Sequence, residues 1–343
     1  YGLFVVIGNV ALILSGFVVN FCSAGIKEYY PNDTTEAIWG ISLKWLMGSV
    51  VIMGIAAMML YRWMHTTVLP DPRYYDGDEV AIHTSKKKKS KPGLIESCKI
   101  IFSSPELGYI ALLIMAYGVS INLVEVQWKE QLKFYFAGDK GGYNGFMGLY
   151  SLWTGLFTIF FSLFIGANVL RIVSWFTAAV VTPVAILFGG GMFFVFILSA
   201  EALPFLQGTV SNILSYFGTN PIAAAAFFGA GIVILSKSIK YALFDPTKEM
   251  AYIPLDDELK TKGKAAVDVI GGRAGKAGGA FVQNMLFLAM ATKDAVAIAP
   301  ICFGVFFLVC ALWVVAVKGL SKKVRAAVAR RDKEALAAGV QPG

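Results

Sequence analysis

The hydrophobic pattern of this chain consists of long, nearly uncharged runs separated by short polar segments. About 20 apolar residues in a helix span the hydrocarbon core of a bilayer, and backbone groups in lipid must bond internally, which favours helices. The runs therefore predict eight transmembrane helices, at residues 3–24, 38–61, 107–124, 146–169, 175–198, 221–243, 275–291 and 297–318. We expect the third of these helices to continue into a polar helical extension.

The composition and the spacing of the runs narrow the fold class. Hydrophobic residues make up 57% of the 343 residues and charged residues only 15%, whereas soluble domains are about one-quarter charged. We therefore predict an all-α, polytopic membrane helix bundle. Its longest polar connection follows two spans and precedes six, and major-facilitator transporters consist of two six-helix halves. This count predicts a major-facilitator-like protein with about eight helices present of an expected twelve.

The predicted domain organisation follows from that count. Residues 1–61 would be the last two helices of an N-terminal half, and residues 101–320 a six-helix C-terminal half. Between them lies a basic, cytoplasmic-type linker at 62–100, with four consecutive lysines at 86–89, and a basic tail follows at 321–343. Lysine and arginine gather in cytoplasmic loops of membrane proteins. We therefore interpret the net charge of +8 as a topology signal and not as a sign of nucleic-acid binding.

One polar stretch directly follows the third apolar run, with the sequence SINLVEVQWKEQLKFYF at residues 120–136. Glu125, Lys129 and Lys133 recur every four residues and would share one helix face, and Asn122 lies one turn before Glu125. They could form a ladder at the membrane boundary, with the lysines extending to water. Alternatively, they line a polar cavity between helices. We favour the cavity, because a carboxylate next to an apolar run is costly without a task.

A second polar stretch, DPTKE at residues 245–249, predicts that a helix begins again at Asp245. Aspartate is a good N-cap and proline suits the first helical position. Lys248 would then lie beside a helix N-terminus, where free N–H groups and the helix dipole attract anions. Lys248 is therefore a candidate phosphate ligand, and the alternative is that it only decorates a helix start.

The glycine-rich stretch GGRAGKAGGA at residues 271–280 does not fit a phosphate-binding Walker loop. That motif needs a glycine five residues before its Gly-Lys pair and a serine or threonine after it. Ile270 and Ala277 occupy these positions. The small residues more simply allow helices to approach closely, which leaves Arg273 and Lys276 as candidates for anion contact or for anchoring at the membrane interface.

Two further lysines, Lys237 and Lys240, end the sixth predicted span. A cation is favourable at a helix C-terminus, so that role and anion binding both remain open for them. The four cysteines show no metal-binding spacing, and both histidines fall in the polar linker. We therefore predict no metal, no cofactor and no catalytic residues, and we do not expect an enzyme. An anion channel with a basic pore is the alternative from a different class.

The run FDPTKEMAYIPLDDELKTKGKAAVD at residues 244–268, with the glycine-rich stretch after it, resembles a signature of the nucleotide transporter family. This family comprises the ATP/ADP translocases of plastids and obligate intracellular bacteria. The segment NLVEVQWK at 122–129 is similar to a family segment whose acidic residue matters for transport. The resemblance also implies that Lys248 is a transport residue.

The resemblance implies exchange of ATP for ADP by alternating access. A proton-coupled or broader-specificity nucleotide importer is the alternative within the family. It further implies the plastid inner envelope or the inner membrane of an intracellular bacterium as location. We expect nucleotides as substrates, the lipid bilayer as surroundings, no nucleic-acid partner and a monomer. The candidate substrate-binding residues are Asn122, Glu125, Lys129, Lys133, Asp245, Lys248, Arg273 and Lys276.

Overall fold

The computed structural model describes residues 2–30, 34–71, 94–199, 204–253, 255 and 259–337. Within these ranges the regular structure is entirely helical, without a strand. The all-α prediction is therefore confirmed. The linker residues 72–93, which include the four lysines at 86–89, and the last residues of the tail, 338–343, lie outside the described part.

Seven helical stretches in the described residues are long and apolar enough to cross a membrane, by length and composition. They match seven of the eight predicted spans. Each stretch overlaps its predicted span, and most of them extend past a predicted end. The stretches are Val5–Tyr29, Thr35–Val68, Pro105–Phe136, Lys140–Ile172, Trp175–Ile197, Pro221–Tyr252 and Ala295–Ala326. The polytopic helix bundle is thereby confirmed, including the polar extension of the third span.

The remaining predicted span, 275–291, is also helical, as the second half of helix α13 (Lys264–Ala289). The helix is not one of the seven, because its first half carries glycines and the charged residues Lys264, Asp268 and Arg273. Lysine, aspartate and arginine are the residues that most oppose insertion at a helix centre. α13 is instead packed along helix α6 (Pro105–Phe136).

Two compact units make up the described chain, and each is considered by itself. The larger unit contains α1 (Gly2–Asn20) up to Ser15, α5 (Leu94–Ser103) and α6, and α7 (Lys140–Phe160) from Tyr150 onwards. It also contains all later elements. These are η3 (Phe161–Gly166), α8 (Ala167–Ile172), α9 (Trp175–Ile197), α10 (Pro204–Tyr216), α11 (Pro221–Ile239), η5 (Lys240–Phe244), α12 (Asp245–Tyr252), η6 (Leu259–Gly263), α13 and α14 (Ala295–Ala337).

The second unit contains the rest of α1, η1 (Phe21–Gly25), α2 (Ile26–Tyr29), α3 (Thr35–Trp63), η2 (Met64–Val68) and the first part of α7. Within it, the Asn20 amide donates a hydrogen bond to the carbonyl oxygen of Gly145 at 2.9 Å. The helix α3 leaves large apolar side chains such as Ile52 and Met53 exposed. Such an apolar exposed surface is what a helix facing lipid presents.

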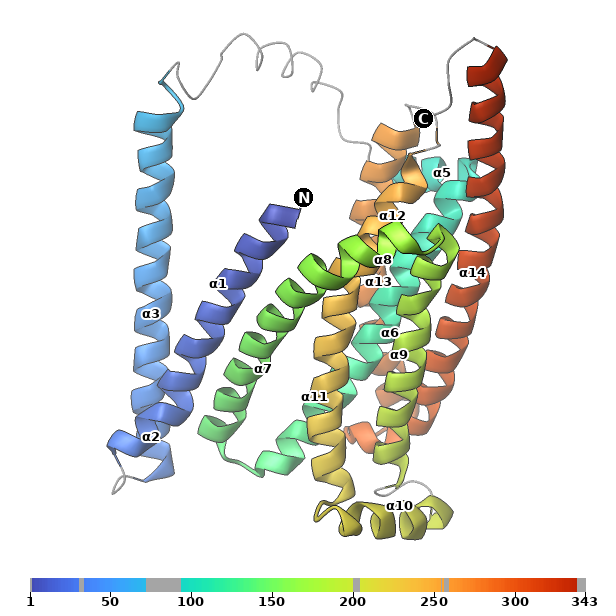
Figure 1. Ribbon diagram of the computed structural model, residues 1–343. Coiled ribbons are helices and arrows are strands. Elements are labelled where there is room, and N and C mark those ends of the chain that lie inside the picture. Colours follow the sequence, from blue (N-terminus) through green and yellow to red (C-terminus); the bar gives the residue numbers. More distant parts are fainter. Residues whose placement is uncertain are drawn as a thin grey trace. The chain divides into compact units, whose positions relative to one another are not determined.

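Helix α6 is the centre of the larger unit, because it packs against α11, α13 and α14. Its Leu123, Trp128 and Leu132 are fully buried, as are Phe306 and Trp313 of α14. In Figure 1 the long helices of this unit run side by side, and α10 lies across the end of α11.

The helices α6 and α13 approach each other closely in the larger unit. A methyl group added at Gly118 of α6 would lie only 2.8 Å from the Cα atom of Gly275 in α13. Gly279, one turn later, faces the Asn122 side chain in the same way, at 2.8 Å. Small residues at such crossings bring helix backbones together. The prediction that the glycine-rich stretch allows close helix approach is therefore confirmed.

One local prediction is wrong: no new helix begins at Asp245, because α11, η5 and α12 form one continuous helical stretch from Pro221 to Tyr252. The structure also contains two helical segments that the apolar runs do not predict. They are α10 and the continuation of α14 past residue 320 to Ala337.

The π-helical turn η5 explains why Pro246 does not interrupt that stretch. A proline removes one backbone donor and crowds the carbonyl group four residues earlier, and π turns absorb such irregularities inside helices. The Thr247 hydroxyl donates to the carbonyl oxygens of Leu243 at 2.7 Å and of Phe244 at 3.0 Å. Asp245 is consequently not an N-cap, and Lys248 does not lie at a free helix N-terminus.

Candidate functional site

A pocket of about 660 Å³ opens within the larger unit. Its volume falls in the range of about 300–1,000 Å³ that is usual for small-molecule sites. Four parts of the chain line it. They are Val5, Gly8, Asn9 and Leu12 of α1, Tyr150, Ser151 and Thr154 of α7, Lys237 and Tyr241 of α11 and η5, and Lys276 of α13.

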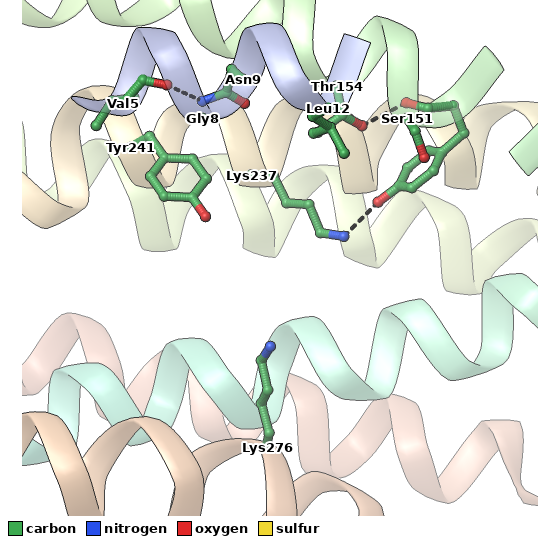
Figure 2. A pocket seen from close by; sticks show the side chains of 10 residues that line it. Val5, Gly8, Asn9, Leu12, Ser151, Thr154, Lys237, Tyr241 and Lys276 are labelled. Carbon is green, nitrogen blue, oxygen red and sulfur yellow. Dashed lines mark hydrogen bonds between the residues drawn. The ribbon is translucent and has the colours of Figure 1, made fainter. Parts of the chain in front are cut away.

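The pocket is basic and rich in hydrogen-bonding groups. Lys237 and Tyr241 reach it from one side, and Lys276 points toward it from the opposite side (Figure 2). An ammonium group can only donate hydrogen bonds, and a phenol can both donate and accept. Two lysines that face one space repel each other there, and an anion between them relieves the repulsion. The pocket is therefore suited to an anionic ligand with several acceptor oxygens.

Glu125 of α6 lies beside the pocket residue Lys237, and its carboxylate is close to lysines on two helices. Its carboxylate is 3.0 Å from the Lys129 ammonium on the same helix and 3.7 Å from the Lys237 ammonium on α11. Lys237 also donates a hydrogen bond to the Tyr150 hydroxyl at 2.6 Å. The structure thus brings Glu125 and Lys129 together with a pocket residue, although neither of them lines the pocket itself. Their place in a polar cavity stays a prediction.

Asn122 and Lys133, the other two candidates on this helix, have different surroundings. The Asn122 side-chain oxygen accepts a hydrogen bond from Gln283 of α13 at 3.2 Å, so it ties α6 to α13. The ammonium of Lys133 lies 2.6 Å from the carboxylate of Glu130, and its side chain is 60% exposed. Lys133 therefore does not pair with Glu125, although the two residues lie on one helix face.

Lys248 lies in a separate cluster of charges where α12 meets α13. Its ammonium is 3.1 Å from the Asp268 carboxylate and 3.4 Å from that of Glu249. Lys264 pairs with the other carboxylate oxygen of Glu249. The Lys248 side chain is only 13% exposed, and it is not among the residues that line the pocket. Its role as a phosphate ligand stays a prediction.

Asp245 and the two remaining cations of the predicted site occupy three distinct positions. Asp245 is buried and lies 2.6 Å from the Lys240 ammonium, five residues earlier across the π turn. Arg273 is exposed on α13. Lys276, three residues later, is the one member of the predicted set that lines the pocket itself.

Sequence reasoning missed the neutral members of the pocket. Asn9, Tyr150 and Tyr241 are ordinary residues in apolar runs, and nothing in the local sequence marks them. Lys237 carried a weak signal, as a cation at the end of a predicted span. The packing of α1, α7 and α11 brings these side chains together, and local sequence patterns do not predict that packing.

A basic, hydroxyl-rich pocket inside a bundle of membrane-crossing helices is typical of membrane transporters for small anionic solutes. The chain belongs to the TLC ATP/ADP transporter family, whose match covers residues 1–324. This family assignment confirms the resemblance and agrees with the prediction that the chain is not an enzyme.

Several relatives of this chain are bacterial carrier proteins. The chain is 40% identical to ADP,ATP carrier protein 1 of Chlamydia pneumoniae, over 97% of this chain and 62% of that protein. It is also 40% identical to ADP,ATP carrier protein 1 of Rickettsia bellii, over 97% of this chain and 63% of that protein. ADP,ATP carrier protein 3 of Rickettsia felis is 39% identical, over 92% of this chain and 62% of its own length.

The chain thus spans about three-fifths of the length of these curated relatives. No solved structure matches it. The major-facilitator-like arrangement and the division into halves therefore stay predictions.

Proposed function

We propose that this protein exchanges ATP for ADP across a membrane, and that the nucleotide phosphates bind in the pocket between Lys237 and Lys276. The family assignment and the printed names of the relatives support the substrates. The observation that carries the site is that Lys237 and Lys276 face one pocket of about 660 Å³ from opposite sides. A nucleotide with about three to four negative charges needs such cations to offset the loss of its hydration.

Alternating access would use the charge pairs around this pocket. Without substrate, Glu125 pairs with Lys129 at 3.0 Å, whereas Lys237 lies 3.7 Å from the same carboxylate. One carboxylate cannot offset the charges of Lys129, Lys237 and Lys276 together, so the empty site would keep an excess of positive charge. A bound phosphate offsets that excess, and reorientation is then favoured only with substrate bound, which is the behaviour of an obligatory exchanger. We further propose the inner membrane of an intracellular bacterium as location, because the relatives are bacterial, and a monomeric carrier without a nucleic-acid partner.

Transport into vesicles tests the exchange. We expect labelled ATP to enter lipid vesicles that contain the natural protein and internal ADP, and to enter ADP-free vesicles very slowly. Equal uptake without internal nucleotide would contradict exchange. Uptake driven by a proton gradient would then favour the importer, and an ionic conductance in planar bilayers would favour the anion channel.

Lys248 remains a second proposed phosphate ligand. Its ion pairs predict whether each variant should strengthen or weaken ATP binding. A phosphate would have to compete with Asp268 for the Lys248 ammonium. Asp268→Asn should therefore strengthen ATP binding, whereas Lys248→Ala should weaken it about ten- to a hundredfold, the worth of one hydrogen bond to a charged group.

The measurement is ATP affinity of the purified variants by calorimetry. Lys248→Arg should recover part of the loss, because charge returns in a different geometry. If Lys248→Ala binds ATP normally while its melting temperature falls, Lys248 only joins α12 to α13, and its assignment as a ligand is wrong.

A further inference from the structure

We propose that Tyr150 is a positioning residue that holds the Lys237 ammonium toward the pocket and away from Glu125. The inference rests on the proposed function of the pocket, and it adds a specific task for a neutral residue. Tyr150 lines the pocket together with Lys237. The two side chains come from different helices, α7 and α11, so their contact also fixes one wall of the pocket against another.

The distances show which group holds Lys237. Its nitrogen is 2.6 Å from the Tyr150 hydroxyl oxygen and 3.7 Å from the nearest Glu125 carboxylate oxygen. The first distance is a short hydrogen bond, whereas the second exceeds the usual hydrogen-bond range. Lys129, at 3.0 Å from the same carboxylate oxygen, satisfies Glu125 more directly. Lys237 therefore keeps its charge available, although a carboxylate lies close by.

The hydroxyl that holds Lys237 is itself rigidly placed. Tyr150 is 7% exposed, and its ring packs against Trp128 with 4.9 Å between ring centroids. Trp128 is fully buried, and its indole N–H donates to the carbonyl oxygen of Ala226 at 2.8 Å. Ala226 belongs to α11, the helix that carries Lys237. The hydroxyl is thus supported from the same helix whose lysine it holds.

The chemistry of a phenol suits this task. Because an ammonium group offers only donors, the Tyr150 oxygen must accept the hydrogen bond from Lys237, and its own proton remains for another acceptor. A phosphate oxygen in the pocket is such an acceptor. A carboxylate at this position would neutralise Lys237 and compete with the substrate, whereas the neutral phenol orients the ammonium and leaves its charge in place.

The test is a double-mutant cycle between Tyr150 and Glu125, read as ATP affinity of the natural protein and its variants. Tyr150→Phe removes one oxygen and keeps the ring against Trp128. We expect about tenfold weaker ATP binding, because Lys237 then moves onto Glu125. Adding Glu125→Gln should restore part of the affinity, since Lys237 no longer has a competing carboxylate. Such coupling is expected only of residues that share a partner.

Tyr241→Phe is the matched control. Tyr241 also lines the pocket, but its ring contacts Lys240, at 4.4 Å from the ammonium to the ring centroid. Glu125→Gln should therefore not rescue Tyr241→Phe. Melting temperatures of all variants, measured alongside, separate a folding defect from a loss of affinity in the folded protein.

The possible outcomes distinguish the two proposals. If Lys237→Ala leaves ATP affinity unchanged, the pocket is not the phosphate site and the proposed function of the pocket fails. If Lys237→Ala weakens binding but Tyr150→Phe does not, only the role of Tyr150 is overturned. Strictly additive losses in the cycle would also overturn it, because a residue that merely supports the fold does not restore affinity through Glu125.

Discussion

Replacing Lys237 and Lys276 together with alanine should weaken ATP binding by about a hundredfold or more. Each lysine faces the same pocket from its own side, and one hydrogen bond to a charged group is worth about ten- to a hundredfold in affinity. The loss should be greatest for ATP, smaller for ADP and smallest for adenosine, because the lysines act on the phosphates. Each single variant should show part of the loss.

The matched control removes two lysines elsewhere. Lys27 and Lys323 have side chains that are 63% and 47% exposed, and among the described residues each forms a long ion pair of 3.8 Å. Their joint replacement with alanine changes the net charge equally and should leave ATP affinity nearly unchanged. Calorimetric titration of both double variants gives the comparison. Equal affinities of the two would show that general charge, and not the pocket, attracts the nucleotide.

Gly275→Val should cause a large loss of stability. The Cβ atom of any residue at 275 would lie 3.0 Å from the Met115 carbonyl oxygen and 3.1 Å from the Gly118 Cα atom. These are backbone atoms that cannot turn aside, so α13 must shift away from α6. Overpacking of this kind costs about 1–3 kcal/mol and occasionally more. The shift would also move Lys276 and lower exchange activity in the protein that still folds.

Gly272→Val is the control on the same helix, because an added Cβ atom at Gly272 meets no heavy atom within 4 Å. Both variants carry the same intrinsic cost of valine in a helix. The difference between their melting temperatures therefore measures the cost of the close contact between α6 and α13. The measurement is the melting temperature of the purified protein. A similar melting temperature for both variants would mean that α6 and α13 do not cross closely in the natural protein.

The sequence predicted the bundle well where apolar runs carry the information. The long helices α6, α9 and α14 follow directly from uncharged stretches of spanning length. α10 was missed because a short helix that lies across the end of others needs no such run. The predicted helix start at Asp245 failed for a different reason. Its aspartate and proline are typical of an N-terminus, but a π turn carries the helix past Pro246.

The site was predictable only where charge stands out against an apolar background. Glu125 and Lys276 are conspicuous for that reason, and the structure places them beside and in the pocket. Nothing in the sequence distinguishes Tyr150 and Asn9, because a tyrosine or an asparagine in an apolar helix is common. Their position depends on which helices meet, and the contacts of α7 with α1 and α11 join residues more than 80 positions apart.

An experimental structure of the natural protein with ATP bound would test the proposed phosphate site most directly. We expect phosphate oxygens within hydrogen-bonding distance of the ammonium groups of Lys237 and Lys276, and the Tyr150 hydroxyl still in contact with Lys237. Phosphate bound elsewhere, for example between Lys248 and Asp268, with the pocket of Lys237 and Lys276 free of nucleotide, would contradict it.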